Sequence, residues 1–319
     1  KVVAQAQEGG GEAAQGSGNA PAGGRTLATS RFKAAYTDAQ EADEDFKLLS
    51  AVEKLLDAFC RAKGIPDSEK KEFLKQLRME ANSKSPDWFM EGLTDVGGMA
   101  QRLWSSVSQG CGKRELCGII NEAIRGDDAA LMPHLAVFAR TMNAGLINRR
   151  GVVEGVAWPP KNETYRGAIL PAEHLAFYQR MVGSKYRVPG FLATSFHQDT
   201  ADLFAERAWG ACEGREAAVR YVVQLDAEGA SRALRRCKHV CLLRTSNVPT
   251  EGEFLYAPYS AFTVVTVALS PTPTYLTPHV IRLHSAIDNR VEPEDLPLAS
   301  LYSPSAGAAG CRRRRRGRG

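Results

Sequence analysis

The sequence lacks any apolar run that approaches the roughly 18 residues needed to span a membrane as a helix, which excludes a membrane-spanning helix. It also lacks a Gly-rich phosphate loop of the P-loop or Rossmann kind, and its six histidines are scattered without the spacing of a metal motif. Neither of these nucleotide-binding folds is therefore predicted, nor is a metal. The chain is expected to be soluble or to be anchored by something outside it.

The seven cysteines are odd in number and form no compact disulfide framework. Cys237 and Cys241 lie close together, but no second close pair lies near them, so a zinc site has little support. Reduced, buried thiols are the expected state. The compartment is left open, with an intracellular one preferred.

Positive charge is concentrated at the C-terminal end of the chain. Arg312 to Arg316 and Arg318 lie in the last eight residues, and without these six arginines 35 basic side chains face 36 acidic ones. The net charge of +5 then falls to about −1, so nucleic-acid binding is not predicted for the folded part. The Arg-rich end is either an electrostatic arm for RNA, acidic partners or nuclear import, or only a solvated tail.

Composition and hydrophobic spacing divide the 319 residues into four parts. Residues 1–42 are rich in Gly, Ala, Gln and Ser, which predicts a disordered lead-in, because such a segment buries too little apolar surface to offset its ordering entropy. Residues 43–148 are predicted to form a helical block and residues 149–290 a domain dominated by strands. Residues 291–319 are predicted to be a tail that contains the Arg-rich end.

The expected elements indicate an α+β fold rather than a doubly wound one. Apolar residues at helical spacing predict helices over about 43–63, 67–77, 99–107, 114–125 and 127–146. The acids Asp127 and Asp128 are well placed for the N-terminus of the last of these. No motif in this block indicates chemistry, since its one histidine, His134, lies in an apolar helix. Later helices are expected from Pro171 and Asp199, and strands over 164–168, 186–194 with a break at 189–190, 219–225, 239–243, 262–269 and 279–284.

Two carboxylates, Glu251 and Glu253, stand one residue apart directly before an aromatic and apolar run that contains Pro258. In an extended backbone, residues i and i+2 point to the same side, so both acids are predicted to lie along one wall of a pocket. A Glu-x-Glu alone is more often a polar loop, but two upstream segments accompany this one. They are Tyr165-Arg166-Gly167 and the run from Gly190 to Phe196, Gly-Phe-Leu-Ala-Thr-Ser-Phe.

In order and spacing, the three segments together resemble the motifs of mono-ADP-ribosyltransferases of the Arg-Ser-Glu class, which includes bacterial toxins and eukaryotic arginine-modifying enzymes. The resemblance covers roughly residues 150–290. It implies a fold of two small facing, mostly antiparallel sheets with flanking helices. It also implies NAD as a substrate and, as acceptor, a protein with an exposed arginine.

The resemblance assigns roles to individual residues. Arg166 is expected to clamp the NAD pyrophosphate, for which a planar guanidinium is suited. Glu253 is expected to stabilise the oxocarbenium-like ribose during cleavage of the nicotinamide bond, and Glu251 to orient the acceptor guanidinium and take its proton. Ser195 is expected to support catalysis, and the remaining expected NAD-binding residues are Gly167, Thr194 and Phe196.

The middle segment departs from the family pattern because Ala193 stands where the first serine of a Ser-Thr-Ser triplet is expected. In the family that hydroxyl helps to hold the catalytic glutamate and NAD, so weaker activity is one expectation. Two alternatives to arginine modification therefore stay open. One is an NAD glycohydrolase that uses water as the acceptor, and the other is a catalytically degenerate binding module.

Overall fold

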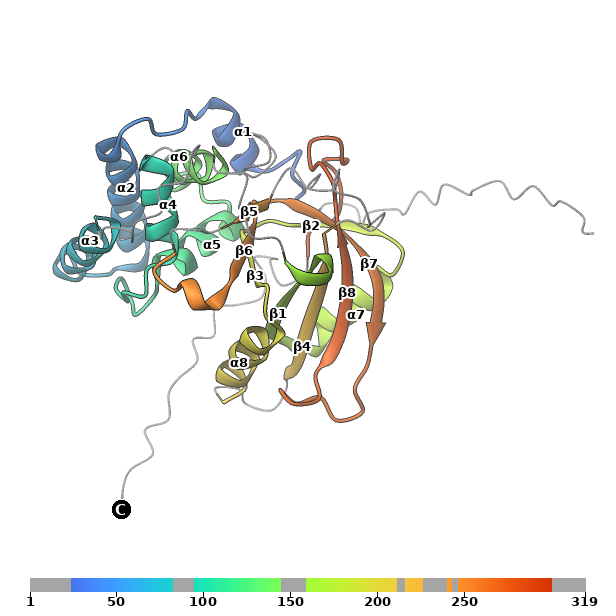
Figure 1. Cartoon of the computed structure of the whole chain (residues 1–319). Coiled ribbons are helices and arrows are strands. Elements are labelled where there is room, and N and C mark those ends of the chain that lie inside the picture. Colours follow the sequence, from blue (N-terminus) through green and yellow to red (C-terminus); the bar gives the residue numbers. More distant parts are fainter. Residues whose placement is uncertain are drawn as a thin grey trace, which may run out of the picture.

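The computed structural model describes residues 24–82, 95–144, 159–210, 216–225, 240–242 and 246–299. Within these ranges, the N-terminal half is helical and the C-terminal half carries all the strands (Figure 1). The N-terminal helices are α1 (Arg31–Asp38), α2 (Asp45–Lys63), α3 (Asp67–Ala81), α4 (Asp95–Trp104), α5 (Leu116–Gly126) and α6 (Met132–Ala144). The expected helical block is thus present, and the α+β class is confirmed.

The strands form one hydrogen-bonded sheet of eight, in the order β2-β7-β8-β4-β1-β3-β6-β5. All neighbouring strands are antiparallel except β4 and β8. The strands are β1 (Glu163–Pro171), β2 (Lys185–Val188), β3 (Leu192–Ser195), β4 (Glu216–Gln224), β5 (Val240–Leu242), β6 (Glu253–Tyr256), β7 (Ser260–Ala268) and β8 (His279–Ser285). Two further helices, α7 (Ala172–Arg180) and α8 (Gln198–Trp209), follow β1 and β3.

The two facing sheets that the resemblance implies are joined here into one hydrogen-bonded sheet. One edge of β1 pairs with β4 along the whole strand, while the other edge reaches β3 at one register pair, Tyr165 opposite Ser195. That pair joins a five-strand portion to the three-strand portion β3-β6-β5. The junction matters for function because two of the sequence motifs meet there.

The helical block and the sheet share apolar contacts. Apolar residues at helical spacing on α2, such as Leu48, Leu55 and Phe59, are fully or almost fully buried, and Gly64 ends the helix in the left-handed conformation. The same cluster of buried side chains includes Phe191, before β3, and Leu255 on β6. The three-strand portion therefore packs directly on the helical block.

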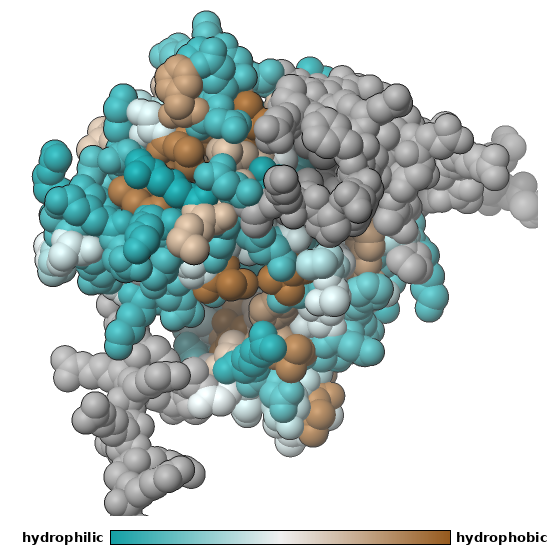
Figure 2. Space-filling model, turned by 60° about the vertical axis from the view of Figure 1, so that its left-hand side comes forward, coloured by the Kyte–Doolittle hydropathy of each residue, from teal (hydrophilic) through white to brown (hydrophobic). Residues whose placement is uncertain are grey.

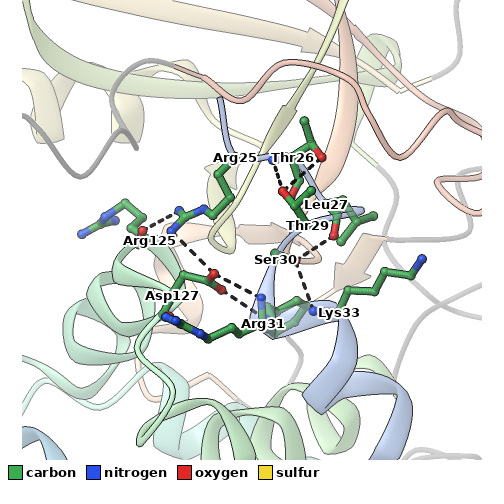
Figure 3. A network of polar contacts seen from close by, with 10 residues as sticks. Arg25, Thr26, Leu27, Thr29, Ser30, Arg31, Lys33, Arg125 and Asp127 are labelled. Atoms are coloured by element: carbon green, nitrogen blue, oxygen red, sulfur yellow. Dashed lines mark hydrogen bonds and ion pairs between the residues drawn. The ribbon is translucent and has the colours of Figure 1, made fainter. Parts of the chain in front are cut away.

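The expected disorder of residues 1–42 is corrected for the part that the structure describes. Residues 31–38 form α1, and the carboxylate of Asp127 accepts a hydrogen bond from the backbone N–H of Arg31 at 3.1 Å (Figure 3). It accepts a second one from the backbone N–H of Phe32 at 3.2 Å. Phe32 is buried and its ring stacks on Tyr259. Contacts with Asp127 and Tyr259 offset the entropy cost of ordering this segment. Its local composition does not show these contacts, so the prediction of disorder was wrong here.

Asp127 also departs from its predicted place at the start of the helix over 127–146. That helix, α6, begins five residues later at Met132, while Asp127 stands after the end of α5 in the left-handed conformation with φ of 53°. The Asp127 carboxylate does bind the N-terminus of a helix, as expected of an acid, but this helix is α1 and not α6.

The segment from residue 288 to 299 is tied to the sheet, although residues from 291 onward were predicted to be a tail. Arg187 on β2 is 1% exposed, and its guanidinium donates to the backbone carbonyls of Tyr259, Asn289, Glu292 and Pro293. The Arg187 backbone also bonds Pro297 and Ala299. The buried guanidinium therefore holds this segment in place through backbone carbonyl groups, and none of these four hydrogen bonds involves a carboxylate.

Several sequence predictions lie outside the described residues, among them residues 1–23, Cys212, Cys237 and the Arg-rich end at 312–318. The described cysteines Cys60, Cys111 and Cys117 are free thiols. None of the described helices combines the length and the apolar character that crossing a lipid bilayer requires.

Candidate functional site

A cleft of about 1200 Å³ lies between the helical block, the three motif strands and α8. In Figure 2 the surface is hollowed below the helical block, and apolar residues border the hollow. Arg166 and Gly167 on β1, Thr194 and Ser195 on β3, and both Glu251 and Glu253 line the cleft. Six of the seven residues that the sequence assigns to a site are therefore brought together.

Strand register places the motif residues in one row. Tyr165 on β1 stands opposite Ser195 on β3, and Ser195 stands opposite Glu253, the first residue of β6. Arg166 is the next residue after Tyr165. The three motifs are about 30 to 60 residues apart in sequence, and the β1-β3-β6 order makes them neighbours.

Glycine is required at the two ends of this row. A Cβ atom on Gly167 would lie 1.9 Å from the backbone oxygen of Ala201, so α8 can approach β1 only where no side chain intervenes. Gly252 has φ of 53°, in the left-handed region. A Cβ atom there would lie 2.9 Å from the His197 ring.

The left-handed Gly252 corrects the prediction that Glu251 and Glu253 share one side of an extended strand. Glu251 ends a short 3₁₀ turn, η3 (Pro249–Glu251), and the left-handed Gly252 separates it from β6, which starts at Glu253. Both acids line the cleft nonetheless. They reach it from a turn and a strand, and not from alternate positions of one strand.

Ser195 and Thr194 brace the walls of the cleft. The Ser195 hydroxyl donates to the Glu251 backbone oxygen at 2.6 Å and accepts from the His197 N–H at 2.9 Å. The Thr194 hydroxyl donates to the Phe254 backbone oxygen at 2.8 Å. These two hydroxyls fix the backbone on either side of Gly252 and Glu253.

Arg166 is held at the junction of β1 and β3. Its Nη1 donates to the Ala193 carbonyl at 2.8 Å. A guanidinium carries five N–H donors, more than this bond uses. Ala193 stands where the motif described above has a serine. It has no side-chain hydroxyl, but its backbone carbonyl anchors Arg166.

Glu253 has an unusual environment for a carboxylate. Its Oε1 accepts a hydrogen bond from the indole Nε1 of Trp104 at 3.0 Å. Burial raises the pKa of Glu253 from its ordinary 4.5 to about 7, the Trp104 hydrogen bond and the positive charge of Arg166 oppose this rise, and Glu251 adds to it. The acid is therefore poised between its two protonation states near neutral pH.

Glu251 is less deeply buried than Glu253. Burial raises its pKa, while the positive charge of Arg207 on α8 lowers it and Glu115 beside α5 raises it. A carboxyl group with a raised pKa is a better proton acceptor when ionised than an ordinary one. Glu251 is thus suited to accept a proton from a group that enters from solvent.

Phe196 is the predicted site residue that does not line the cleft. Its ring packs on Phe254, with 5.7 Å between ring centroids, and it belongs with the apolar residues around the sheet core. The nearby Phe191 is buried at the contact between the helical block and β3, while Phe196 is partly buried. Both aromatic rings serve packing in this structure.

The helical block supplies cleft residues that sequence analysis missed, since no chemistry was expected there. Trp104 and Glu115 line the cleft, and so does Asn121, whose side chain bonds the backbone of Phe191. No motif marks these residues. An indole or an amide in an amphipathic helix looks like any other core or surface residue until its distant partner is known.

No protein-family model matches the chain, and the search of curated proteins finds no match. Solved structures similar to it include the following three. HopU1 of Pseudomonas syringae pv. Tomato DC3000 is 14% identical, with 77% of this chain and 98% of that one covered and a TM-score of 0.45. The Vis toxin from Vibrio splendidus is 16% identical, with 80% and 90% covered and a TM-score of 0.40. Exoenzyme S from Pseudomonas aeruginosa, in complex with human 14-3-3 protein beta and bound to carba-NAD, is 16% identical, with 77% and 95% covered and a TM-score of 0.40.

HopU1 and Vis are ADP-ribosyltransferases, the class that the three sequence motifs resemble. At identities and TM-scores this low, the function of this chain has to be inferred from the residues of its own cleft.

Proposed function

We propose that this protein transfers ADP-ribose from NAD to the guanidinium of an arginine on another protein and releases nicotinamide. The observation that carries the proposal is the meeting of Arg166, Ser195 and Glu253 in one cleft. A cation for a pyrophosphate and an acid for a sugar cation are what this reaction needs, and the cleft offers both.

Arg166 is proposed to bind the pyrophosphate of NAD. Phosphate oxygens match the planar fork of a guanidinium, and each pair of N–H groups can make two parallel hydrogen bonds. The Ala193 carbonyl holds one N–H and so limits the orientations of the side chain. The remaining donors of the guanidinium are proposed to bind the phosphate oxygens.

Glu253 is proposed to act at the ribose. When the bond between ribose C1′ and the nicotinamide nitrogen breaks, its electron pair leaves with neutral nicotinamide, and positive charge develops on the ribose. An ionised Glu253 beside the sugar stabilises that charge. The acceptor nitrogen then forms the new bond to C1′.

Glu251 is proposed to act on the acceptor. A guanidinium is a weak nucleophile while protonated, and attack becomes favourable when a carboxylate orients it and takes a proton. Glu251 lies nearer to solvent than Glu253 and is close enough to Glu115 for the two acids to influence each other. Negative charge at this end of the cleft suits a cationic acceptor.

The test is incubation with NAD labelled in its adenylate part, together with an arginine-rich protein as acceptor. Nicotinamide release and label on the protein are both measured. Glu253→Gln is expected to lower both by a hundred- to a thousandfold, while Glu251→Gln is expected to abolish labelling and to keep part of the nicotinamide release. The exposed Glu206→Gln on α8, which does not line the cleft, is the matched control and is expected to leave both rates unchanged.

Three results would contradict the proposal. Full activity in Glu253→Gln would remove the role of that acid. Free ADP-ribose without label on protein would identify an NAD glycohydrolase. Absence of NAD binding in calorimetry, with a native circular dichroism spectrum, would identify a non-catalytic binding module.

A further inference from the structure

The contact between Trp104 and Glu253 joins two parts of the chain that are 149 residues apart. Trp104 is the last residue of α4, is 3% exposed and presents its indole edge to the cleft. Of the described residues, it is the one that donates a hydrogen bond to the Glu253 carboxylate. Ala193, on the neighbouring strand, has no hydroxyl that could do so.

Trp104 is locked in place from the other side. Its ring packs on Phe191, with 4.8 Å between ring centroids and 56° between planes. Asn121 on α5 holds Phe191 at both backbone groups: its Oδ1 accepts the Phe191 N–H at 2.8 Å, and its Nδ2 donates to the Phe191 oxygen at 3.2 Å. The donor therefore needs little reorganisation to keep pointing at Glu253.

The same end of α4 also anchors the segment that leads to Glu251. Asn247 bonds the Ser105 hydroxyl through its backbone N–H and the Arg102 backbone oxygen through its side chain, both at 2.9 Å. Both acids of the cleft are thus connected to one helix terminus in the helical block.

We propose that Trp104 is a positioning residue, which fixes the orientation of the Glu253 carboxylate and favours its ionised form. This inference rests on the proposed function, in which ionised Glu253 faces the ribose. The indole N–H occupies Oε1 and leaves Oε2 to face the substrate. A hydrogen bond to the charged form stabilises that form, so its loss makes the carboxyl group harder to ionise.

Three other groups influence the ionisation of Glu253, so the test has to leave them unchanged. Arg166 on β1 favours the ionised acid, and Glu251 on η3 opposes it. Cys117 on α5 also faces Glu253 closely enough for the two to interact. None of these groups is altered by a change at position 104.

The experiment compares the wild-type protein with Trp104→Phe and with a variant that carries benzothienylalanine at position 104. The second side chain keeps the shape of the indole but replaces its N–H by sulfur, so packing is preserved even if the smaller phenylalanine loosens the core. In both, kcat for nicotinamide release is expected to fall about tenfold to a hundredfold, with KM for NAD within about threefold. The acid limb of the kcat profile is expected to move to higher pH by about half a unit or more.

A second measurement does not depend on activity. Carbon-13 NMR of the Glu253 side-chain carboxyl, in the protein without NAD, is expected to give a higher pKa in both variants than in the wild type. An unchanged kcat and an unchanged Glu253 titration in the benzothienylalanine variant would overturn the proposal. If Glu253→Gln retains full activity, the proposed function fails instead, while the NMR titration still decides whether Trp104 controls Glu253.

Discussion

Replacing Glu253 by glutamine is predicted to stabilise the protein at alkaline pH, because the folded protein holds a buried acid that resists ionisation. The pKa of Glu253 is raised by burial from 4.5 to about 7. A group whose folded-state pKa lies above its unfolded value contributes stability that is fully present below the unfolded pKa and is lost as pH rises through the folded one. The window for this loss is therefore pH 4.5 to 7.

The size of the effect follows from the same two values. A difference of about 2.5 pKa units at 1.36 kcal/mol each corresponds to about 3 kcal/mol between acid and alkaline limits. Glutamine does not ionise, and its side-chain oxygen can still accept the Trp104 hydrogen bond. Glu253→Gln should therefore match the wild type near pH 4.5 and exceed it by up to about 3 kcal/mol at pH 8.

Urea unfolding followed by circular dichroism at pH 4.5, 6 and 8 measures this difference directly. The exposed Glu206→Gln, as control, is expected to show no pH-dependent change relative to the wild type. If Glu253→Gln differed from the wild type by the same amount at all three pH values, or were less stable at pH 8, burial would not control this acid. A gain in stability together with a loss of activity would mark Glu253 as a residue kept for function.

Three further changes test the fold that carries the site. Arg187→Met is expected to destabilise the protein by about 2 to 4 kcal/mol in urea unfolding, because four backbone carbonyls lose their buried partner. A loss below about 0.5 kcal/mol, the scale of an ordinary surface substitution, would contradict this expectation. Gly167→Ala is expected to cost about 1 to 3 kcal/mol and to lower NAD turnover, since its Cβ would collide with the Ala201 backbone oxygen on α8, and unchanged stability and turnover would refute it. Asp127→Ala is expected to cost about 0.5 to 2 kcal/mol through loss of the bonds to the N-terminus of α1, and faster proteolysis of residues 24–38 should accompany it.

The motif strands could be predicted from sequence because their signals are local. Arg166, Ser195 and Glu253 each sit in a short segment whose alternation and flanking glycines indicate a strand or its end. The meeting of the three segments then followed from a known order of motifs, and the structure places all three in one cleft. Glu251 and Glu253 both line the cleft, as expected, but the extended backbone predicted between them is wrong, because Gly252 adopts a positive φ.

The remaining features depend on partners that are far away in sequence. Helix α1 forms in a segment whose composition predicts disorder, because Asp127, 96 residues later, caps its first N–H groups. Trp104 becomes part of the cleft only when β6 is placed beside α4. The order of residues 291–299 likewise depends on Arg187, about a hundred residues earlier, so no local pattern could reveal it.

The most direct test of the central claim is an experimental structure with a non-hydrolysable NAD analogue. We predict that the analogue occupies the cleft, with its pyrophosphate within hydrogen-bond distance of Arg166 and with the ribose that carries nicotinamide next to Glu253. Binding at another place, or a cleft pose in which neither side chain touches the analogue, would contradict it.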